Sequence, residues 1–248
     1  MIPAGDLATL ALLVPIAFLG SIVFGLTGFG SALVTIPLAS HFLPLPLAIA
    51  TFSVIDLANA LRVGLERPGN AVRGEWLRLL PTILVGVAVG TTVLVNLPRQ
   101  AGMGALGVFV FAYAVYALAR RPALTRVSTR WAYPAGFAGG VTGTIFGAGG
   151  PPYAIYLSHR GLTKDQFRAT LSLTTLFSIS VRVAAFALSG LLADTRVWVA
   201  AAACVPASML GIALASRLFR RLSREVLMRA IACVLLATGL SLMVRAMN

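Results

Sequence analysis

Acidic residues are scarce in this sequence, which carries only 7 Asp and Glu against 20 Lys and Arg over 248 residues. Charged residues make up 11% of the chain and hydrophobic residues 58%. A soluble domain has roughly 25% charged and about 45–50% apolar residues. So few charges cannot cover the surface of a water-soluble protein of this size. The composition therefore predicts a protein whose surface mostly faces lipid.

The sequence also lacks the residue patterns of an enzyme or a metalloprotein. Its two cysteines, Cys204 and Cys233, lie in apolar runs without a CxxC partner, which favours packing roles over a disulfide or a metal site. There is no HExxH, no phosphate loop ending in GK[ST] and no pair of carboxylates. His41 and His159 are 118 residues apart and are predicted to lie on opposite sides of the membrane. We therefore expect no catalytic set, no metal and no cofactor.

No basic region precedes the first apolar stretch: the residues before it include Asp6 but neither Lys nor Arg. A cleavable signal peptide begins with such a region, so the first segment is expected to remain in the protein. The net charge of +13 would suggest a nucleic-acid partner in a soluble protein. Here the arginines lie in short gaps between apolar runs, which indicates loops that face anionic headgroups and no nucleic acid.

Eight stretches are apolar and long enough to span a bilayer, which takes roughly 20 residues as a helix. Inside lipid every backbone N–H and C=O must be satisfied within the chain, so these runs are expected to be helices. The expected fold class is an all-α polytopic membrane protein. The segments cover residues 7–40, 46–65, 76–95, 101–119, 131–158, 165–190, 196–216 and 225–246.

Two of these segments contain glycine clusters that one continuous helix would not accommodate well. The first segment holds GLTGFG from Gly25 to Gly30, and the fifth holds GTIFGAGGPP from Gly143 to Pro152. Glycine tolerates positive φ, and proline lacks an amide hydrogen and disfavours helix in the residue before it. Close helix packing is the competing explanation for the glycines. It is the weaker one for the fifth segment, because the double proline adds a steric argument.

The two halves of the chain match at an offset of 119 residues. The register continues from the broken segment into the next helix, where ATFS at 50–53 aligns with ATLS at 169–172. Corresponding glycine- or proline-interrupted segments in two halves point to the binding site of a transporter. The glycines that align are Gly20 with Gly139, Gly28 with Gly147, and Gly30 with Gly149.

The distribution of cations decides between two topologies. If all eight segments simply cross the membrane, ten cations lie on one side and nine on the other, against the positive-inside tendency. If the two glycine-broken segments instead enter and leave on the same side, sixteen cations lie on that side and three on the other. The second arrangement, with two re-entrant or two-helix hairpins, is therefore favoured.

Each half then contributes one broken hairpin and three crossings, and because three is odd the halves have opposite orientations. The expected organisation is an inverted repeat of residues 1–120 and 121–248. Both termini are expected on the outer, periplasmic side of an inner membrane. Inverted repeats place two related gates around one central site, which is the arrangement used in alternating access.

The glycine breaks themselves predict an anion site. Amide hydrogens at a helix break lose their partners, and the N-terminus of the following half-helix carries a positive partial charge of roughly half a unit. Such ends bind anions. The expected donors are the amides of Gly30, Ser31 and Ala32 in the first break and of Gly149 and Gly150 in the second. Pro151 suits the first turn of a helix, where no donor is needed.

Hydroxyl and charged side chains lie near the breaks. A single Ser or Thr in a helix usually bonds to its own backbone, but Thr51 with Thr170 and Ser53 with Ser172 recur in the repeat register. Arg182 lies inside the sixth segment, where it is expected either to meet the substrate or to reach the outer interface. The candidate substrate-binding residues are Thr27, Gly28, Gly30, Ser31, Thr51, Ser53, Gly147, Gly149, Gly150, Pro151, Thr170, Ser172 and Arg182.

Asp56 and Asn59 lie one helical turn apart in the second segment. A carboxylate inside a membrane is costly and usually functional or paired. Asp56 is therefore expected either to carry a coupling ion, H⁺ or Na⁺, or to form a structural ion pair with Arg182. The sequence leaves these two roles open.

On its two glycine-rich stretches, Gly25 to Gly30 followed by Ile36-Pro37 and Gly143 to Pro152, the chain resembles the TauE/SafE sulfite exporter family of membrane permeases. The layout of the whole chain agrees with the family, although Phe29 and Ser31 interrupt the longer glycine cluster that the family has in its first break. The resemblance implies transport, often outward and ion-coupled, of sulfite, sulfoacetate or related organosulfonates.

The leading hypothesis is thus a secondary transporter for a small, sulfur-containing anion bound near the middle of the membrane. An anion channel that uses the same hairpins as a filter is the alternative. A membrane-embedded enzyme or assembly factor is disfavoured, because the sequence offers no polar catalytic set. The expected partners are the anion, the lipid bilayer and a coupling ion, and the sequence leaves the oligomeric state open.

Overall fold

The computed structural model describes residues 4–66, 68–119 and 126–218, together with residues 236, 239–240 and 243–244. Within these residues every regular element is a helix. Most of the last predicted segment, 225–246, lies outside the described residues. The helices are α1 (Ala4–Thr27), α2 (Ser31–Ala39), α3 (Leu45–Gly64), η1 (Pro68–Asn70), α4 (Arg73–Asn96), α5 (Arg99–Ala119), η2 (Thr129–Trp131), α6 (Ala132–Phe146), α7 (Gly150–Ser158), α8 (Lys164–Leu188) and α9 (Thr195–Leu218).

Five of these helices, α1, α3, α4, α8 and α9, are long and apolar enough to cross a membrane. Each predicted unbroken segment in the described part corresponds to one helix, with ends that differ by a few residues: 46–65 is α3, 76–95 is α4, 101–119 is α5, 165–190 is α8 and 196–216 is α9. The prediction of an all-α protein with several membrane helices is confirmed.

The segments 7–40 and 131–158 are each interrupted at their glycines. Helix α1 ends at Thr27, and Gly28 and Gly30 then adopt φ values of +81° and +90° before α2 begins. Helix α6 ends at Phe146, followed by Gly147 at φ +71° and by α7 from Gly150. A side chain is strained at such angles. Glycine therefore allows the chain to turn sharply at these points, and neither segment is a single helix.

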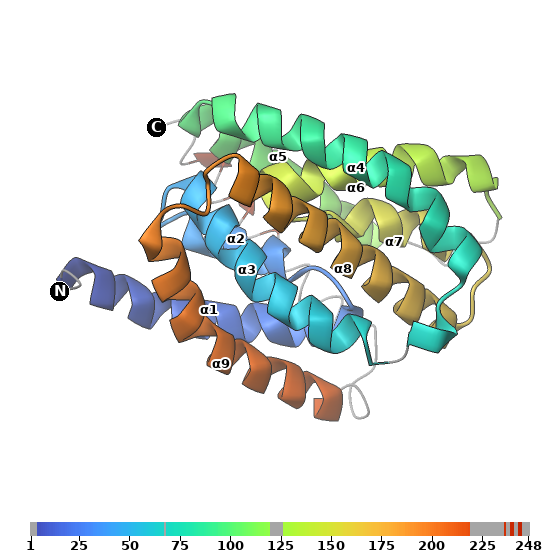
Figure 1. The fold of residues 1–248 in the computed structure, drawn as a ribbon, viewed down its shortest axis with the longest axis horizontal. Coiled ribbons are helices and arrows are strands. Elements are labelled where there is room, and N and C mark those ends of the chain that lie inside the picture. The colour runs from blue at the N-terminus through green and yellow to red at the C-terminus, as the bar shows by residue number, and fades with distance from the viewer. Residues whose placement is uncertain are drawn as a thin grey trace.

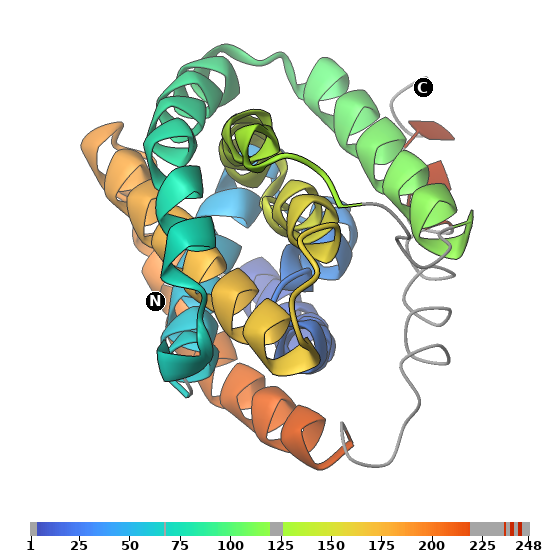
Figure 2. The same cartoon turned by 90° about the vertical axis from the view of Figure 1, so that its right-hand side faces the viewer.

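Each short helix folds back along the helix before it (Figure 1). Helix α2 packs against α1, and α7 packs against α6. Seen from the end, α2 and α7 lie in the middle of the bundle, with α4, α5, α8 and α9 around them (Figure 2). Every residue of α2 except Leu38 is buried. The two glycine breaks therefore lie inside the protein, away from lipid.

Glycines also bring α4 and α6 into close contact. A Cβ on Gly140 would lie 2.7 Å from the carbonyl oxygen of Ile83, and one on Gly136 would lie 2.7 Å from that of Leu79. A Cβ on Gly86 would overlap the carbonyl oxygen of Phe137. Small residues allow this approach between membrane helices, whose association depends on packing because lipid is as apolar as the helices. The contact fixes the first arm of the second hairpin against α4.

We predict that Gly86→Ala lowers the melting temperature of the purified protein in detergent. The added methyl group has to push α6 away from α4, and overpacking of this kind costs about 1–3 kcal/mol. Gly69→Ala is the matched control, since a Cβ there meets nothing within 4 Å. Equal melting temperatures for the two variants would contradict the close contact between α4 and α6.

Candidate functional site

The two glycine breaks meet each other in the middle of the bundle. A Cβ on Gly147 would lie 2.8 Å from the Cβ of Ala32, and a Cβ on Gly150 would overlap the ring of Phe29. A Cβ on Gly28 would lie 2.7 Å from Oγ of Ser172 on α8. The absence of side chains at these glycines is what allows the breaks and α8 to approach one another.

The N-terminal ends of two helices lie at these breaks. Ser31 is the first residue of α2 and Gly150 the first residue of α7, and the first amides of a helix have no acceptor within it. Each N-terminus also carries a positive partial charge. Pro151 is buried in the first turn of α7, where its missing amide hydrogen costs nothing. The contact between the breaks thus brings two electropositive backbone ends together.

One face of α8 carries a row of buried polar side chains. Ser172, Thr175, Ser178 and Arg182 follow one another at spacings of three or four residues, which places them on the same side of a helix. All four are at most 6% exposed. Oγ of Ser172 and Oγ1 of Thr175 have no hydrogen-bond partner within the described protein. The row therefore offers polar groups that the fold itself does not use.

Arg182 is the charged group of this row. Its Nη1 donates to the carbonyl oxygen of Gly143, near the end of α6, while Nε and Nη2 have no hydrogen-bond partner among the described residues. A guanidinium has five N–H donors, and buried polar groups are normally hydrogen-bonded. The side chain is only 2% exposed, so the interpretation that Arg182 reaches the outer interface is wrong. Its two nitrogens without a partner therefore lie inside the protein.

Asp56 lies beside the first break, on α3. It is 2% exposed and accepts a hydrogen bond of 2.6 Å from Oγ of Ser31. Among the described residues no ion pair within 4.0 Å joins Asp56 to Arg182, although their opposite charges attract each other. Asn59 holds helices together: it donates to Ser21 at 3.0 Å and accepts from Ser208 at 2.9 Å. The buried carboxylate thus contacts the N-terminal residue of α2.

The predicted hydroxyls differ in how they are used. Oγ1 of Thr51 is buried without a hydrogen-bond partner, and so is Oγ of Ser172. Ser53 donates to the carbonyl oxygen of Ile49 at 2.6 Å. Thr170 accepts from the amide of Val72 at 2.9 Å. Thr27 lies 2.8 Å from the carbonyl oxygen of Val23 and also bonds to Phe29 across the break. Their role toward a substrate remains a prediction.

The structure adds polar residues that the sequence analysis did not single out. The hydroxyls of Tyr153 and Ser178 are 2.9 Å apart, and Thr35 and Thr175 each bury a hydroxyl without a partner. The repeat offset could have pointed to two of these residues, Thr175 and Ser178. Applied to Asp56 and Asn59, the offset of 119 residues gives Thr175 and Ser178. Tyr153 has no such signal, because the equivalent position is Val34.

A family comparison decides the identity of the chain. The model of the family described as "Sulfite exporter TauE/SafE" matches residues 13–242. The chain belongs to the TauE/SafE family. It is therefore a membrane transporter and not an enzyme, as the glycine-rich stretches indicated.

Two curated relatives are similar to the chain. One, from Cupriavidus necator, is named "Probable sulfite/organosulfonate exporter TauE" and is 28% identical over 90% of this chain and 89% of its own length. The other, from Comamonas testosteroni, is named "Probable inner membrane transporter protein TsaS" and is 25% identical over 66% of this chain and 69% of its own length. No solved structure matches the chain significantly.

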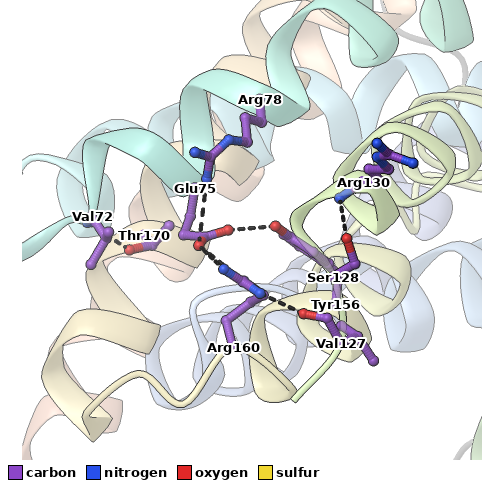
Figure 3. A network of polar contacts seen from close by, with 9 residues as sticks. All are labelled: Val72, Glu75, Arg78, Val127, Ser128, Arg130, Tyr156, Arg160 and Thr170. Atoms are coloured by element: carbon purple, nitrogen blue, oxygen red, sulfur yellow. Dashed lines mark hydrogen bonds and ion pairs between the residues drawn. The ribbon is translucent and has the colours of Figure 1, made fainter.

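A polar network fixes the second hairpin of this TauE/SafE protein where α7 ends (Figure 3). Glu75, in the first turn of α4, accepts hydrogen bonds from the hydroxyl of Tyr156 and, at 2.9 Å, from Nε of Arg160. Arg160 also donates to the carbonyl oxygen of Val127 and lies over the Tyr156 ring. The hydrogen bond with Glu75 raises the pKa of Arg160, so its charge is retained. Helix α7 is thereby tied to α4 and to the segment before α6.

We predict that Tyr156→Phe destabilises the protein. The change removes a donor from a buried carboxylate, and a hydrogen bond to a charged group contributes about 1.5–3 kcal/mol. The melting temperature in detergent should fall. Tyr133→Phe is the matched control, because Tyr133 is on α6 and 49% exposed. If Tyr156→Phe had the same melting temperature as the wild type, the network would not be what holds α7.

Proposed function

We propose that the protein is a secondary transporter that exports a small sulfur-containing anion, sulfite or an organosulfonate, bound where the two glycine breaks meet. The observation that carries this proposal is the buried guanidinium of Arg182, with two nitrogens that the described protein leaves without a hydrogen-bond partner. A buried charge of this kind is retained in membrane proteins where it serves a substrate or ion pathway.

The chemistry around Arg182 suits a tetrahedral oxyanion. Sulfite and sulfonates present three oxygens that accept charge-assisted hydrogen bonds, and a guanidinium can donate two of these in parallel. The first turns of α2 and α7 supply further amide donors and positive partial charge. The hydroxyls of Thr51, Ser172 and Thr175 are available at buried positions. The name of the Cupriavidus relative supports the choice of sulfur oxyanions over carboxylates.

We further propose that the halves 1–120 and 121–248 form an inverted repeat with alternating access. The support is the sixteen-to-three distribution of cations in the sequence and the glycine break in each half. By the positive-inside tendency, the end of the bundle that carries Arg62, Arg78, Arg160 and Arg168 is cytoplasmic. We name it the arginine-rich end. Both termini then lie on the periplasmic side of the inner membrane.

Asp56 is the proposed coupling residue. Its carboxylate accepts from Ser31, the first residue of α2, so its charge is placed next to the proposed anion site. Two negative charges at so short a distance repel each other. A proton or Na⁺ taken up at Asp56 would relieve this repulsion, which would link binding of the anion to binding of the cation. Asn59 supports the position of Asp56 by joining α3 to α1 and α9.

We predict that Arg182→Gln abolishes or strongly weakens binding of sulfite. Loss of a charge-assisted hydrogen bond costs about 1.5–3 kcal/mol, which corresponds to roughly tenfold to hundredfold in Kd. The measurement is the upward shift of the melting temperature with sulfite. Arg196→Gln, at an exposed position paired with Asp194, is the control and should keep the full shift. An unchanged shift in Arg182→Gln would remove Arg182 from the site.

We predict that Gly28→Ala, Gly30→Ala and Gly147→Ala abolish counterflow of sulfite in proteoliposomes but allow membrane insertion. All three glycines have positive φ, where a methyl group is strained. Gly149→Ala should act by overlap instead, because its Cβ would lie 2.6 Å from the carbonyl oxygen of Gly139. Normal transport in all four variants would defeat the proposed site. Conductance without counterflow in the wild type would indicate a channel.

A further inference from the structure

A cavity opens beside the first glycine break at the arginine-rich end of the bundle. Its volume is about 250 Å³ and its lining comprises Gly25, Arg62, Val63, Glu66, Arg168 and Ile212. Two cationic side chains and one carboxylate thus line a space large enough for a small anion. A smaller cavity shares Val63, Glu66 and Arg168 with it and reaches Ser172.

Arg168 is held at the wall of this cavity by two contacts. Its Nη2 donates to the carbonyl oxygen of Gly25, in the last turn of α1, at 3.3 Å. The same nitrogen lies 3.5 Å from Oε2 of Glu66. The side chain of Arg168 is 29% exposed and that of Glu66 51%. The guanidinium is therefore oriented by the backbone near the break, while its partner carboxylate is mostly in solvent and can be replaced.

The smaller cavity reaches the beginning of the polar row on α8. Ser172, which lines the smaller cavity, is the residue that Gly28 faces. Thr175 and Arg182 follow it on the same face of the helix. Ser172 and Thr175 bury hydroxyls without a hydrogen-bond partner in the described protein. An anion in the cavity would thus be at the beginning of a row of polar groups that ends at Arg182.

The three charged residues that line this cavity have apolar residues at the equivalent positions of the other half, although its Val63 corresponds to Arg182. The offset of 119 residues relates Arg62 to Val181, Arg168 to Ile49 and Glu66 to Ala185. Ile49 is fully buried. Arg62, Glu66 and Arg168 therefore have no charged counterpart in the repeat register. A difference of this kind between two related entrances favours binding of the anion from one side.

We infer that Arg62 and Arg168 form a second anion-binding subsite, at the arginine-rich mouth, which takes up the sulfonate or sulfite before it reaches Arg182. The incoming anion takes the place of the Glu66 carboxylate at Nη2 of Arg168. Long-range attraction by the two arginines raises the local anion concentration at the mouth. The inference rests on the proposed function, since it concerns the route of the same anion.

The test is ¹⁹F NMR titration of the full-length protein in nanodiscs with trifluoromethanesulfonate, a tetrahedral sulfonate probe, with sulfite as competitor. Wild type should show two saturable sites. Arg168→Gln and Arg62→Gln should each weaken one of them about tenfold, and Arg182→Gln should remove the other. The mouth site should also weaken with salt, because partly exposed charges are screened. Arg130→Gln, at an exposed arginine outside the cavity, should change neither site.

The affinity of the mouth site in a Glu66 variant distinguishes a binding role of Arg168 from a purely structural one. Glu66→Gln removes the internal competitor and should tighten the mouth site, whereas an effect through α1 alone would weaken it. The subsite would be overturned if the wild type showed a single site that Arg182→Gln abolishes and that Arg168→Gln and Arg62→Gln leave unchanged. The proposed function would stand in that case. Two sites that both persist in Arg182→Gln would contradict the central site. The mouth subsite would then stand if Arg168→Gln weakens one of the two sites, and would be overturned if it weakens neither.

Discussion

The arrangement depends on a backbone constraint of the membrane interior, where a helix can be interrupted only if the freed peptide groups find partners. Here each break is closed by a threonine that precedes it. Thr27 bonds to both the amide and the carbonyl oxygen of Phe29. The carbonyl oxygen of Thr142 accepts a hydrogen bond of 3.3 Å from the amide of Ala148. The hydroxyl of Thr142 lies 3.2 Å from the carbonyl oxygen of Ala148. The first-turn amides of α2 and α7 are the backbone donors that the proposed site would use for an anion.

The electrostatics of the site follow from these breaks. Two helix N-termini and the Arg182 guanidinium are positive, and the nearby carboxylate, Asp56, contacts Ser31 at one of the N-termini. Asp56 therefore provides part of the counter-charge that a substrate anion would provide. The position of Arg182 is fixed by Gly143 on α6, and α6 is in turn held by its glycine contacts with α4. The packing of small residues thus determines where the buried charge lies.

Local rules were sufficient to predict the helices and both breaks, because hydropathy and glycine conformation act within a few residues. They were also sufficient to mark Arg182 and Ser172, since a charge or a repeated hydroxyl inside an apolar run is unusual. The partners of these groups depend on packing between distant segments. Nothing local indicates that Arg182 contacts Gly143, that Tyr153 contacts Ser178, or that Glu75 on α4 binds Arg160 after α7. The ion pair with Arg182 was one of two roles left open for Asp56, and the hydrogen bond that Asp56 accepts from Ser31 could not be read from the sequence for the same reason.

The contacts of the aligned glycines bear on how such a transporter would work. Gly28 faces Ser172, but its repeat partner Gly147 faces Ala32 and Ile36 and not Ser53. Equivalent positions in the two halves therefore have different neighbours. In an inverted repeat that alternates between two states, each half adopts in one state the contacts that the other half has in the second state. In the proposed inverted repeat, the difference between Gly28 and Gly147 is what a single state of that cycle requires, and the cavity beside Gly28 would be its opening at the arginine-rich end.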